Sequence, residues 1–200
     1  MLDAARRCFL EMGYEAVTVR DIVRLTDLAS GTFYNYFQDK ECMFREILEV
    51  RISDLNDRLH EVRRQAQSIE GFIRGAYQTL FRKVGDDPDF FRLILRNEFV
   101  VRSLFRDTVI GAPMRALRED IRDAIRRGVF PEVDVNLLAA SFYGTAFEIG
   151  RVLVEQSGTT PEAAAEFATT LLSNGVAGFG GERGVVRIFP LAKQRNLGLP

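Results

Sequence analysis

The chain has 200 residues, of which 46% are apolar, a composition that suits a soluble globular protein of one or two small domains. The net charge is −1, so overall charge gives no sign of a nucleic-acid binder. One histidine and two cysteines far apart in sequence exclude a His-rich metal site and a disulfide-stapled scaffold. We therefore expect a reduced, cytoplasmic protein that carries no metal and no cofactor.

The sequence contains no evident membrane span. Its most apolar stretch, residues 137–154, carries Glu148 and Arg151, whereas a span needs about 18 residues or more with few or no charges. The N-terminus has the pattern of an amphipathic helix rather than that of a signal peptide. Because no strand pattern or repeat is present, the predicted fold is all-α, with about nine helices.

The first predicted helix carries one apolar stripe and ends at a glycine. Leu2, Ala5, Phe9 and Met12 are spaced three, four and three residues apart, and Gly13 follows as a helix stop.

Two short helices joined by a tight turn come next. Apolar residues at helical spacing mark these helices at 19–23 and 33–37. Between them, Asp27 tolerates the left-handed turn conformation, Leu28 can fill the gap between the helices, and Ser30 can cap the second one. This pattern is typical of a helix-turn-helix, whose second helix enters the major groove of DNA.

Three outward-facing residues of the second helix are candidates for reading bases. Thr32, Tyr34 and Asn35 lie between the core positions Phe33 and Phe37 and therefore project away from the core. Asn can bind adenine in a bidentate way, and Thr can hydrogen-bond a base or touch a thymine methyl group. Tyr34 could pack on a sugar or a base edge.

Residues 1–64 hold ten Lys and Arg against twelve Asp and Glu, so any positive surface that contacts DNA must be local. Residues at the helix starts are the candidates for phosphate contacts. We place Thr18, Arg20 and Ser30 in this group. Thr18 and Asp21 also form a variant of the capping box. For Thr18 and Arg20 the alternative, a cap and a solvated charge, carries equal weight.

The segment GTFYNYF followed by Asp-Lys-Glu resembles the recognition helix of TetR (tetracycline-repressor-like) transcriptional regulators. The preceding LDAARRCFLEMGYEAVTVRDIV resembles the first two helices of the same family, and the similarity covers residues 2–48. It implies that Tyr36 hydrogen-bonds a backbone phosphate. It also implies that Lys40, at the start of the next helix, binds phosphate with the help of the helix dipole.

Asp39 is the expected N-cap of a long helix over residues 39–64, and this helix links two predicted domains. The helix-turn-helix domain occupies residues 1–45 and a helical ligand-binding and dimerisation body occupies residues 46–179. The glycine-rich tail at 180–200 is expected to be disordered.

The body is predicted to contain helices separated by glycine- and proline-containing breaks near 85–88, 111–113, 128–134 and 157–161. In particular, residues 90–105 read as one aromatic-rich helix. The only histidine, His60, is expected to be solvated on the long helix.

The family resemblance implies an apolar ligand pocket among the body helices, whereas plain core packing is the alternative for each aromatic residue. The candidate pocket residues are Phe81, Phe91, Leu95, Arg96, Phe99, Met114, Leu117, Tyr143 and Phe147.

The last two long helices are rich in small residues, which let helices approach closely. The resemblance implies that they form a four-helix dimer interface, and packing within one chain is the alternative. A dimer is favoured because one helix-turn-helix reads only half of a palindrome. The candidate interface residues are Ala140, Gly144, Phe147, Ala164, Ala168, Leu171 and Leu172.

These features predict a transcriptional regulator, more specifically a repressor, that binds palindromic double-stranded DNA as a homodimer and responds to an unknown small molecule. One alternative is a helix-turn-helix regulator without a small-molecule ligand. The other is a helical enzyme or carrier, which the sequence disfavours because it has no nucleophile–base pair, metal motif or phosphate loop. An enclosed cavity of a few hundred Å³ would favour the ligand-responsive form.

Overall fold

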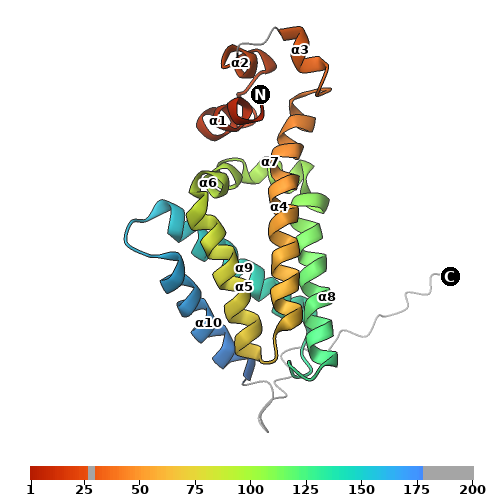
Figure 1. Cartoon of the computed structure of the whole chain (residues 1–200), viewed down its shortest axis with the longest axis vertical. Helices are drawn as coiled ribbons and strands as arrows, with labels where there is room; N and C mark the ends of the chain where they lie inside the picture. Colours follow the sequence, from red (N-terminus) through yellow and green to blue (C-terminus); the bar gives the residue numbers. More distant parts are fainter. Residues whose placement is uncertain (27–29, 178–200) are drawn as a thin grey trace, which may run out of the picture.

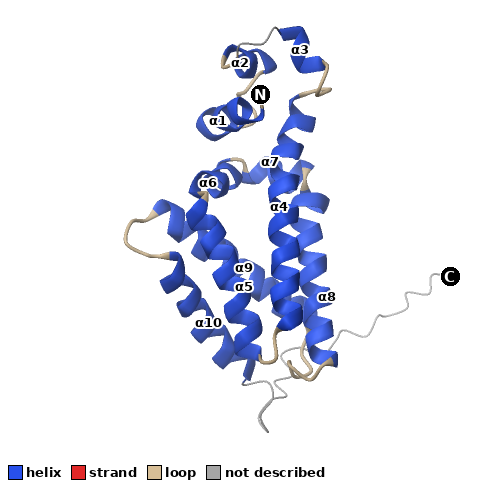
Figure 2. Ribbon diagram, viewed as in Figure 1, coloured by secondary structure: helices blue, strands red, loops and turns tan. Residues whose placement is uncertain are grey.

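The computed structural model describes residues 1–26 and 30–177, and these residues form helices joined by loops, with no strand among them (Figure 1, Figure 2). The prediction of an all-α fold is confirmed. The described residues form ten α-helices and one π-helix, more than the nine expected, because the segment after residue 88 is divided. The tail at 180–200, for which disorder was expected, lies outside the described residues, as does the turn at 27–29.

Three short helices form a head at one end of the molecule, namely α1 (Leu2–Met12), α2 (Val19–Arg24) and α3 (Ser30–Tyr34) (Figure 1). Gly13 ends α1 with a φ of 82°, a backbone conformation that favours glycine. The predicted capping box of α2 is present. The Thr18 hydroxyl accepts from the Asp21 amide at 3.3 Å, and the Asp21 carboxylate accepts from the Thr18 amide at 2.9 Å.

The long helix α4 (Lys40–Gln65) starts in the head and runs along the body, where it packs against α5 and α8 (Figure 1). Asp39 caps it as predicted, since its carboxylate accepts from the Cys42 amide at 2.8 Å.

The remaining helices build the body. They are α5 (Ile69–Asp86), α6 (Pro88–Arg96), α7 (Glu98–Leu104), the π-helix η1 (Arg106–Gly111), α8 (Ala112–Arg126), α9 (Val135–Glu155) and α10 (Pro161–Ala177). Asp87 caps α6 and Pro88 occupies its first turn, as the sequence suggested.

One expectation about the middle of the chain is wrong. Residues 90–105 are not one helix, because the chain leaves helical geometry at Asn97, whose side chain donates to the Leu93 carbonyl at 2.8 Å and competes with the helix backbone. At 111–113, where the helix was expected to break or restart, η1 ends at Gly111 and α8 starts directly at Ala112. Proline in the first turn of α8 needs no amide donor, so Pro113 does not interrupt the helix.

Buried apolar side chains form two clusters. The head cluster includes residues of α1 to α4 but also residues of α6, α7 and η1, namely Leu93, Val100, Val101, Phe105 and Val109. The body cluster joins α5, α8, α9 and α10. Consequently, α6 and α7 pack with the head although they follow the long helix in sequence.

Helix α9 is long and apolar enough to cross a membrane by length and composition alone, with 21 residues and a mean hydropathy of 1.3. In the structure it packs against α5, α6, α8 and α10. Its Arg151 forms an ion pair with Glu98 of α7 at 3.1 Å. These contacts are those of a helix in a bundle.

Candidate DNA-binding head and ligand pocket

The second helix of the head presents polar and aromatic side chains to solvent. Phe33 is fully buried and anchors α3, with its ring 5.9 Å from that of Phe37. Tyr34 and Tyr36 are 63% and 73% exposed, and Asn35 is exposed as well. These three side chains are free to meet another surface.

The remaining predicted DNA contacts of the head differ in how accessible their side chains are. Thr32 is half-buried. The hydroxyl of Thr18 is engaged in the capping box, where its hydrogen bond to Asp21 is the main cause of a lowered pKa of that carboxyl. Arg20 is exposed, whereas the side chain of Ser30 lies outside the part of the chain that the structure describes.

Lys40 is directed into the head rather than toward solvent. Its ammonium donates to the carbonyl oxygens of Tyr14 at 2.7 Å, Val17 at 2.9 Å and Glu15 at 3.4 Å. It also lies 4.5 Å from the centre of the Tyr14 ring. A lysine ammonium has three donors, so all three are used to hold the loop between α1 and α2 against the start of α4.

Asn97 ties the same loop to the body, a role that no local sequence pattern indicated. This buried side chain accepts from the Tyr14 amide at 2.6 Å and donates to the Phe9 carbonyl at 3.2 Å and the Leu93 carbonyl at 2.8 Å. It therefore satisfies backbone groups at the end of α1 and of α6 at once. A movement of α6 would therefore displace the end of α1 through these hydrogen bonds.

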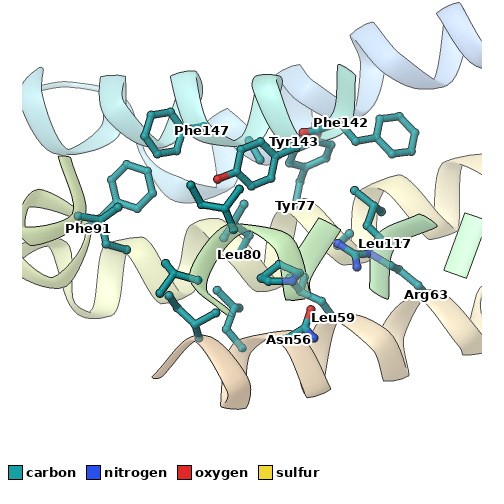
Figure 3. Close-up of a pocket in the computed structure, with 18 of the residues that line it drawn as sticks. Asn56, Leu59, Arg63, Tyr77, Leu80, Phe91, Leu117, Phe142, Tyr143 and Phe147 are labelled. Atoms are coloured by element: carbon teal, nitrogen blue, oxygen red, sulfur yellow. The ribbon is translucent and has the colours of Figure 1, made fainter. Parts of the chain in front are cut away.

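An apolar cavity of about 170 Å³ lies among α4, α5, α6, α8 and α9 (Figure 3). Most of its lining is aliphatic or aromatic. The polar residues in the lining are Asn56, Arg63, Tyr77, Glu98, Arg102 and Tyr143. The site is thus an apolar chamber with few polar groups, which is the usual composition of a small-molecule site.

The structure brings four of the nine candidate pocket residues to this cavity, namely Phe91, Leu117, Tyr143 and Phe147 (Figure 3). The other five lie elsewhere. Phe81 is packed in the body core. Leu95, Arg96 and Phe99 border a surface hollow beside the loop between α1 and α2, and Met114 borders another hollow near η1. The helical repeat explains this: Phe91 and Ile94 of α6 face the cavity, so Leu95 and Arg96 face away from it.

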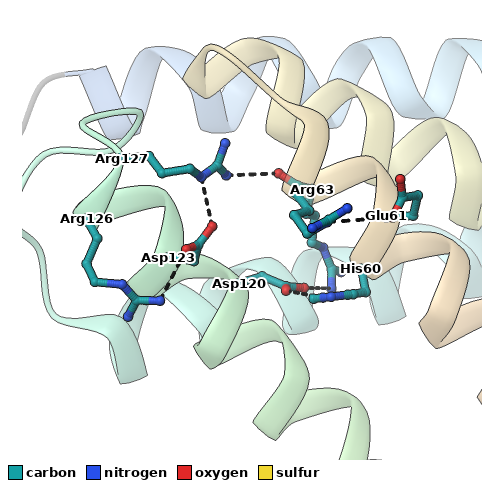
Figure 4. A network of polar contacts seen from close by, with 8 residues as sticks. His60, Glu61, Arg63, Asp120, Asp123, Arg126 and Arg127 are labelled. Carbon is teal, nitrogen blue, oxygen red and sulfur yellow. Dashed lines mark hydrogen bonds and ion pairs between the residues drawn. The ribbon is translucent and has the colours of Figure 1, made fainter.

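One end of the cavity adjoins a buried polar network (Figure 4). Arg63 of α4 is only 8% exposed, and its Nη1 donates to Asp120 of α8 at 3.2 Å. The other oxygen of Asp120 lies 2.6 Å from Nδ1 of His60, which is exposed as expected and in addition contacts this carboxylate. Burial lowers the pKa of Arg63, and Asp120 opposes that shift.

At the opposite end, Glu98 of α7 accepts hydrogen bonds from Arg102 at 2.9 Å and from Arg151 at 3.1 Å. Burial raises the pKa of Glu98, but the hydrogen bonds from the two arginines outweigh it and the net shift is downward. Both guanidinium groups also lie within 6 Å of the Phe147 ring, at 5.8 and 5.5 Å from its centre. Glu98 is therefore ionised and links α7 to α9.

Residues 1–47 match the family model described as "Bacterial regulatory proteins, tetR family". The head of the chain is therefore of the TetR type. Over 62 residues it is 40% identical to the HTH-type transcriptional repressor KstR2 of Rhodococcus jostii, an alignment that covers 31% of this chain and 30% of that protein. Over 99 residues it is 31% identical to the HTH-type transcriptional repressor Rv1474c of Mycobacterium tuberculosis, which covers 46% of this chain and 53% of the relative. These alignments thus span 30% and 53% of the two relatives.

The fold of the body is shared as well. The structure of the fatty acid degradation regulator FadR from Bacillus halodurans superposes with a TM-score of 0.74 at 21% identity, over 86% of this chain and 92% of that one. At this identity the similarity establishes the arrangement of the TetR-type head and helical body and nothing about what the cavity holds.

The outer face of α9 and α10 carries exposed apolar residues. Leu137, Phe167 and Leu171 are 68%, 64% and 56% exposed, and the predicted interface residues Ala140 and Gly144 are exposed beside them. The other predicted interface residues differ. Ala164 and Ala168 are buried in the body core where α10 packs on α5, so they serve packing within one chain. Leu172 is half-buried, and Phe147 lines the cavity.

Proposed function

We propose that the protein is a cytoplasmic transcriptional repressor that binds a palindromic DNA operator as a homodimer and is released by a small apolar ligand. The observation that carries this proposal is the packing of the TetR-type head on α6 and α7, the helices that also wall the cavity. Occupation of the cavity and the position of the head are thereby linked through shared side chains.

On DNA, the exposed residues of the head take different roles. Asn35 reads a base edge, and Tyr34 packs beside it in the major groove. Tyr36 and Arg20 contact backbone phosphates, which supply affinity without sequence preference. Lys40 acts as a positioning residue, because its ammonium holds the loop that orients α2 and α3.

Dimerisation through the exposed face of α9 and α10 would set the two heads one turn of DNA apart, about 34 Å. A homodimer uses the same patch twice, and the apolar side chains Leu137, Phe167 and Leu171 suit such a self-complementary contact.

The response to a ligand is a population shift between two packings of the body. A ligand that prefers the second packing displaces Phe91 and Ile94 of α6 and the facing side of α4. Asn97 transmits the displacement to the loop after α1, and the two recognition helices lose their spacing. The ligand shifts the equilibrium only by its difference in affinity for the two packings.

The cavity volume of about 170 Å³ is smaller than the few hundred Å³ that would fit a drug-sized molecule. It supports a small ligand, or a larger one that opens the helices. A regulator without a ligand is the competing function, and it predicts that filling the cavity leaves DNA binding unchanged. Among the described residues no group of three His, Cys, Asp or Glu could hold a metal ion.

Selection of bound DNA from a random pool, followed by measurement of the salt dependence of the best sequence, tests the proposal. A palindrome with half-sites one turn apart is expected, and Asn35→Ala should relax preference at one base pair in each half. Failure to enrich any sequence would contradict DNA recognition by this head.

A further inference from the structure

Two buried polar atoms that face the cavity have no hydrogen-bond partner. In the described part of the chain, only four buried side-chain nitrogen or oxygen atoms are in this state, namely Asn56 Oδ1, Arg63 Nε, Arg118 Nε and Ser173 Oγ. Asn56 and Arg63 both belong to α4, and both line the same cavity (Figure 3). Buried polar groups normally have partners, so two orphans in one apolar chamber point to a bound group that satisfies them.

The charge of Arg63 is already balanced. Its Nη1 pairs with Asp120, whose second oxygen is held by His60 (Figure 4). The Nε–H of Arg63 can therefore donate a hydrogen bond, while the positive charge of the guanidinium is already neutralised by Asp120. The Oδ1 of Asn56, two turns earlier on the same helix, is an acceptor that lacks a donor.

We propose that the cavity binds an apolar molecule that carries a neutral oxygen group, a hydroxyl or a carbonyl, at the end next to Arg63. The inference rests on the ligand-responsive function proposed above and defines its ligand class. The oxygen accepts from Arg63 Nε–H, and a hydroxyl can in addition donate to Asn56 Oδ1. A carboxylate would bring an extra negative charge beside the Arg63–Asp120 pair, and an amine would add a second positive charge beside Arg63, each inside an apolar chamber.

The volume sets the size of this molecule. An engineered protein cavity of about 150 Å³ binds benzene, so a cavity of about 170 Å³ suits a single ring or a short aliphatic chain. Phe91 and Phe147, whose rings are 5.8 Å apart, close the chamber on the side away from Arg63 (Figure 3).

Titration calorimetry of the full chain with four probes of equal length tests the proposal: octan-1-ol, octan-2-one, octanoate and octylammonium. The two neutral probes are expected to bind at least tenfold more tightly than the two ions at neutral pH. Tightest binding by octanoate or octylammonium, or no binding by any of the four, would overturn it.

Variants assign the polar end. The double variant Arg63→Met with Asp120→Asn keeps the site neutral, and it should weaken octan-2-one about tenfold while the far-ultraviolet circular dichroism is retained. If this variant does not fold, Asn56→Leu serves instead, and it should weaken octan-1-ol more than octan-2-one. Ser173→Ala removes a buried orphan outside the cavity and is the matched control, with no change expected. Equal affinities in all variants would remove Arg63 and Asn56 from the site.

Binding to DNA is measured separately, so the two proposals can fail independently. If the neutral probes bind as expected but leave operator affinity unchanged, the ligand response fails and the assignment of the cavity stands. If operator binding responds only to a charged probe, the assignment fails and the response stands.

Discussion

At the residue scale, two side chains of the molecule satisfy backbone groups that lie far away in sequence. Lys40 and Asn97 both bind the backbone of Tyr14, in the loop between α1 and α2. Burial, followed by the nearby carboxylates of Glu41 and Asp39, raises the pKa of the Tyr14 hydroxyl to about 12, so this ring stays neutral under Lys40.

Lys40→Met should destabilise the head by about 1–3 kcal/mol, because three carbonyl oxygens lose a charged donor. Affinity for operator and for random DNA should fall together. Thermal unfolding and DNA titrations check this, with Arg20→Ala as the control that lowers affinity and leaves the melting temperature in place. An unchanged melting temperature with a reduced salt slope would instead assign Lys40 to a phosphate, as the family resemblance implied.

The capping carboxylates predict a loss of stability in acid. The pKa of Asp39 is lowered chiefly by the Cys42 amide, and that of Asp21 by the Thr18 hydroxyl. Because the folded-state pKa lies below the unfolded value of about 3.9, this stabilisation is complete above that value and is lost as the pH falls through the folded pKa. Asp39→Asn should unfold with a weaker dependence on pH below about 4 and be similar to the parent at pH 7, since Asn caps equally well. Identical acid transitions in the two proteins would contradict a contribution from Asp39.

Local chemistry made part of the site predictable. The partners in both caps lie three residues apart, so Thr18 with Asp21 and Asp39 with Cys42 could be read from sequence. The partners of Asn97 lie 83 and 88 residues away, and Asp120 meets Arg63 across 57 residues. No local sequence pattern predicts such pairs. A polar residue in an apolar stretch gives the same pattern whether its side chain faces solvent, a ligand or another helix.

At the scale of elements, the division between α6 and α7 is the feature that links cavity and head. The apolar periodicity predicted a single helix over residues 90–105, because the segments before and after Asn97 are both apolar. Periodicity does not reveal that the Asn97 side chain competes with the helix backbone for hydrogen bonds. The same limit explains the pocket prediction. The repeat identified an aromatic helix, but which of its faces met the cavity depended on the placement of α4 and α9.

Asn97→Ala should destabilise the protein by about 1–3 kcal/mol, because the buried Tyr14 amide loses its acceptor. It should also make DNA affinity less sensitive to occupation of the cavity, since the hydrogen bonds that link the end of α6 to the end of α1 would be lost. Denaturant unfolding gives the first quantity, and operator titrations with and without octan-1-ol give the second. Asn136→Ala, an exposed change on α9, is the control. A full ligand response in Asn97→Ala would contradict the transmission through this side chain.

At the scale of the whole molecule, folding of a single chain leaves three large apolar side chains of α9 and α10 exposed, namely Leu137, Phe167 and Leu171. The abundance of small residues in both helices was visible in the sequence. Which of them faced outward was not, because Ala164 and Ala168 are used to pack α10 on α5. The proposed two-fold contact would bury this patch.

Phe167→Glu should convert a dimer into a monomer and abolish tight binding to the full palindrome while leaving weak binding to a half-site. Sedimentation velocity and DNA titrations measure the two effects. Val50→Glu, which places the same charge at an equally exposed apolar position on α4, should change neither assembly nor stability by much. A Phe167→Glu protein that still sediments as a dimer would move the interface elsewhere.

If the packing of the cavity controls the head, a variant that fills the cavity should alter DNA binding without any ligand. Ala76→Leu adds apolar volume to the lining from α5, and Gln67→Leu is the exposed control. The measurement is affinity for the selected operator. The account predicts that Ala76→Leu weakens operator binding at least tenfold in a folded dimer, while Gln67→Leu has no effect. Unchanged operator affinity in a folded Ala76→Leu dimer would contradict the claim and favour a regulator that responds to no small molecule.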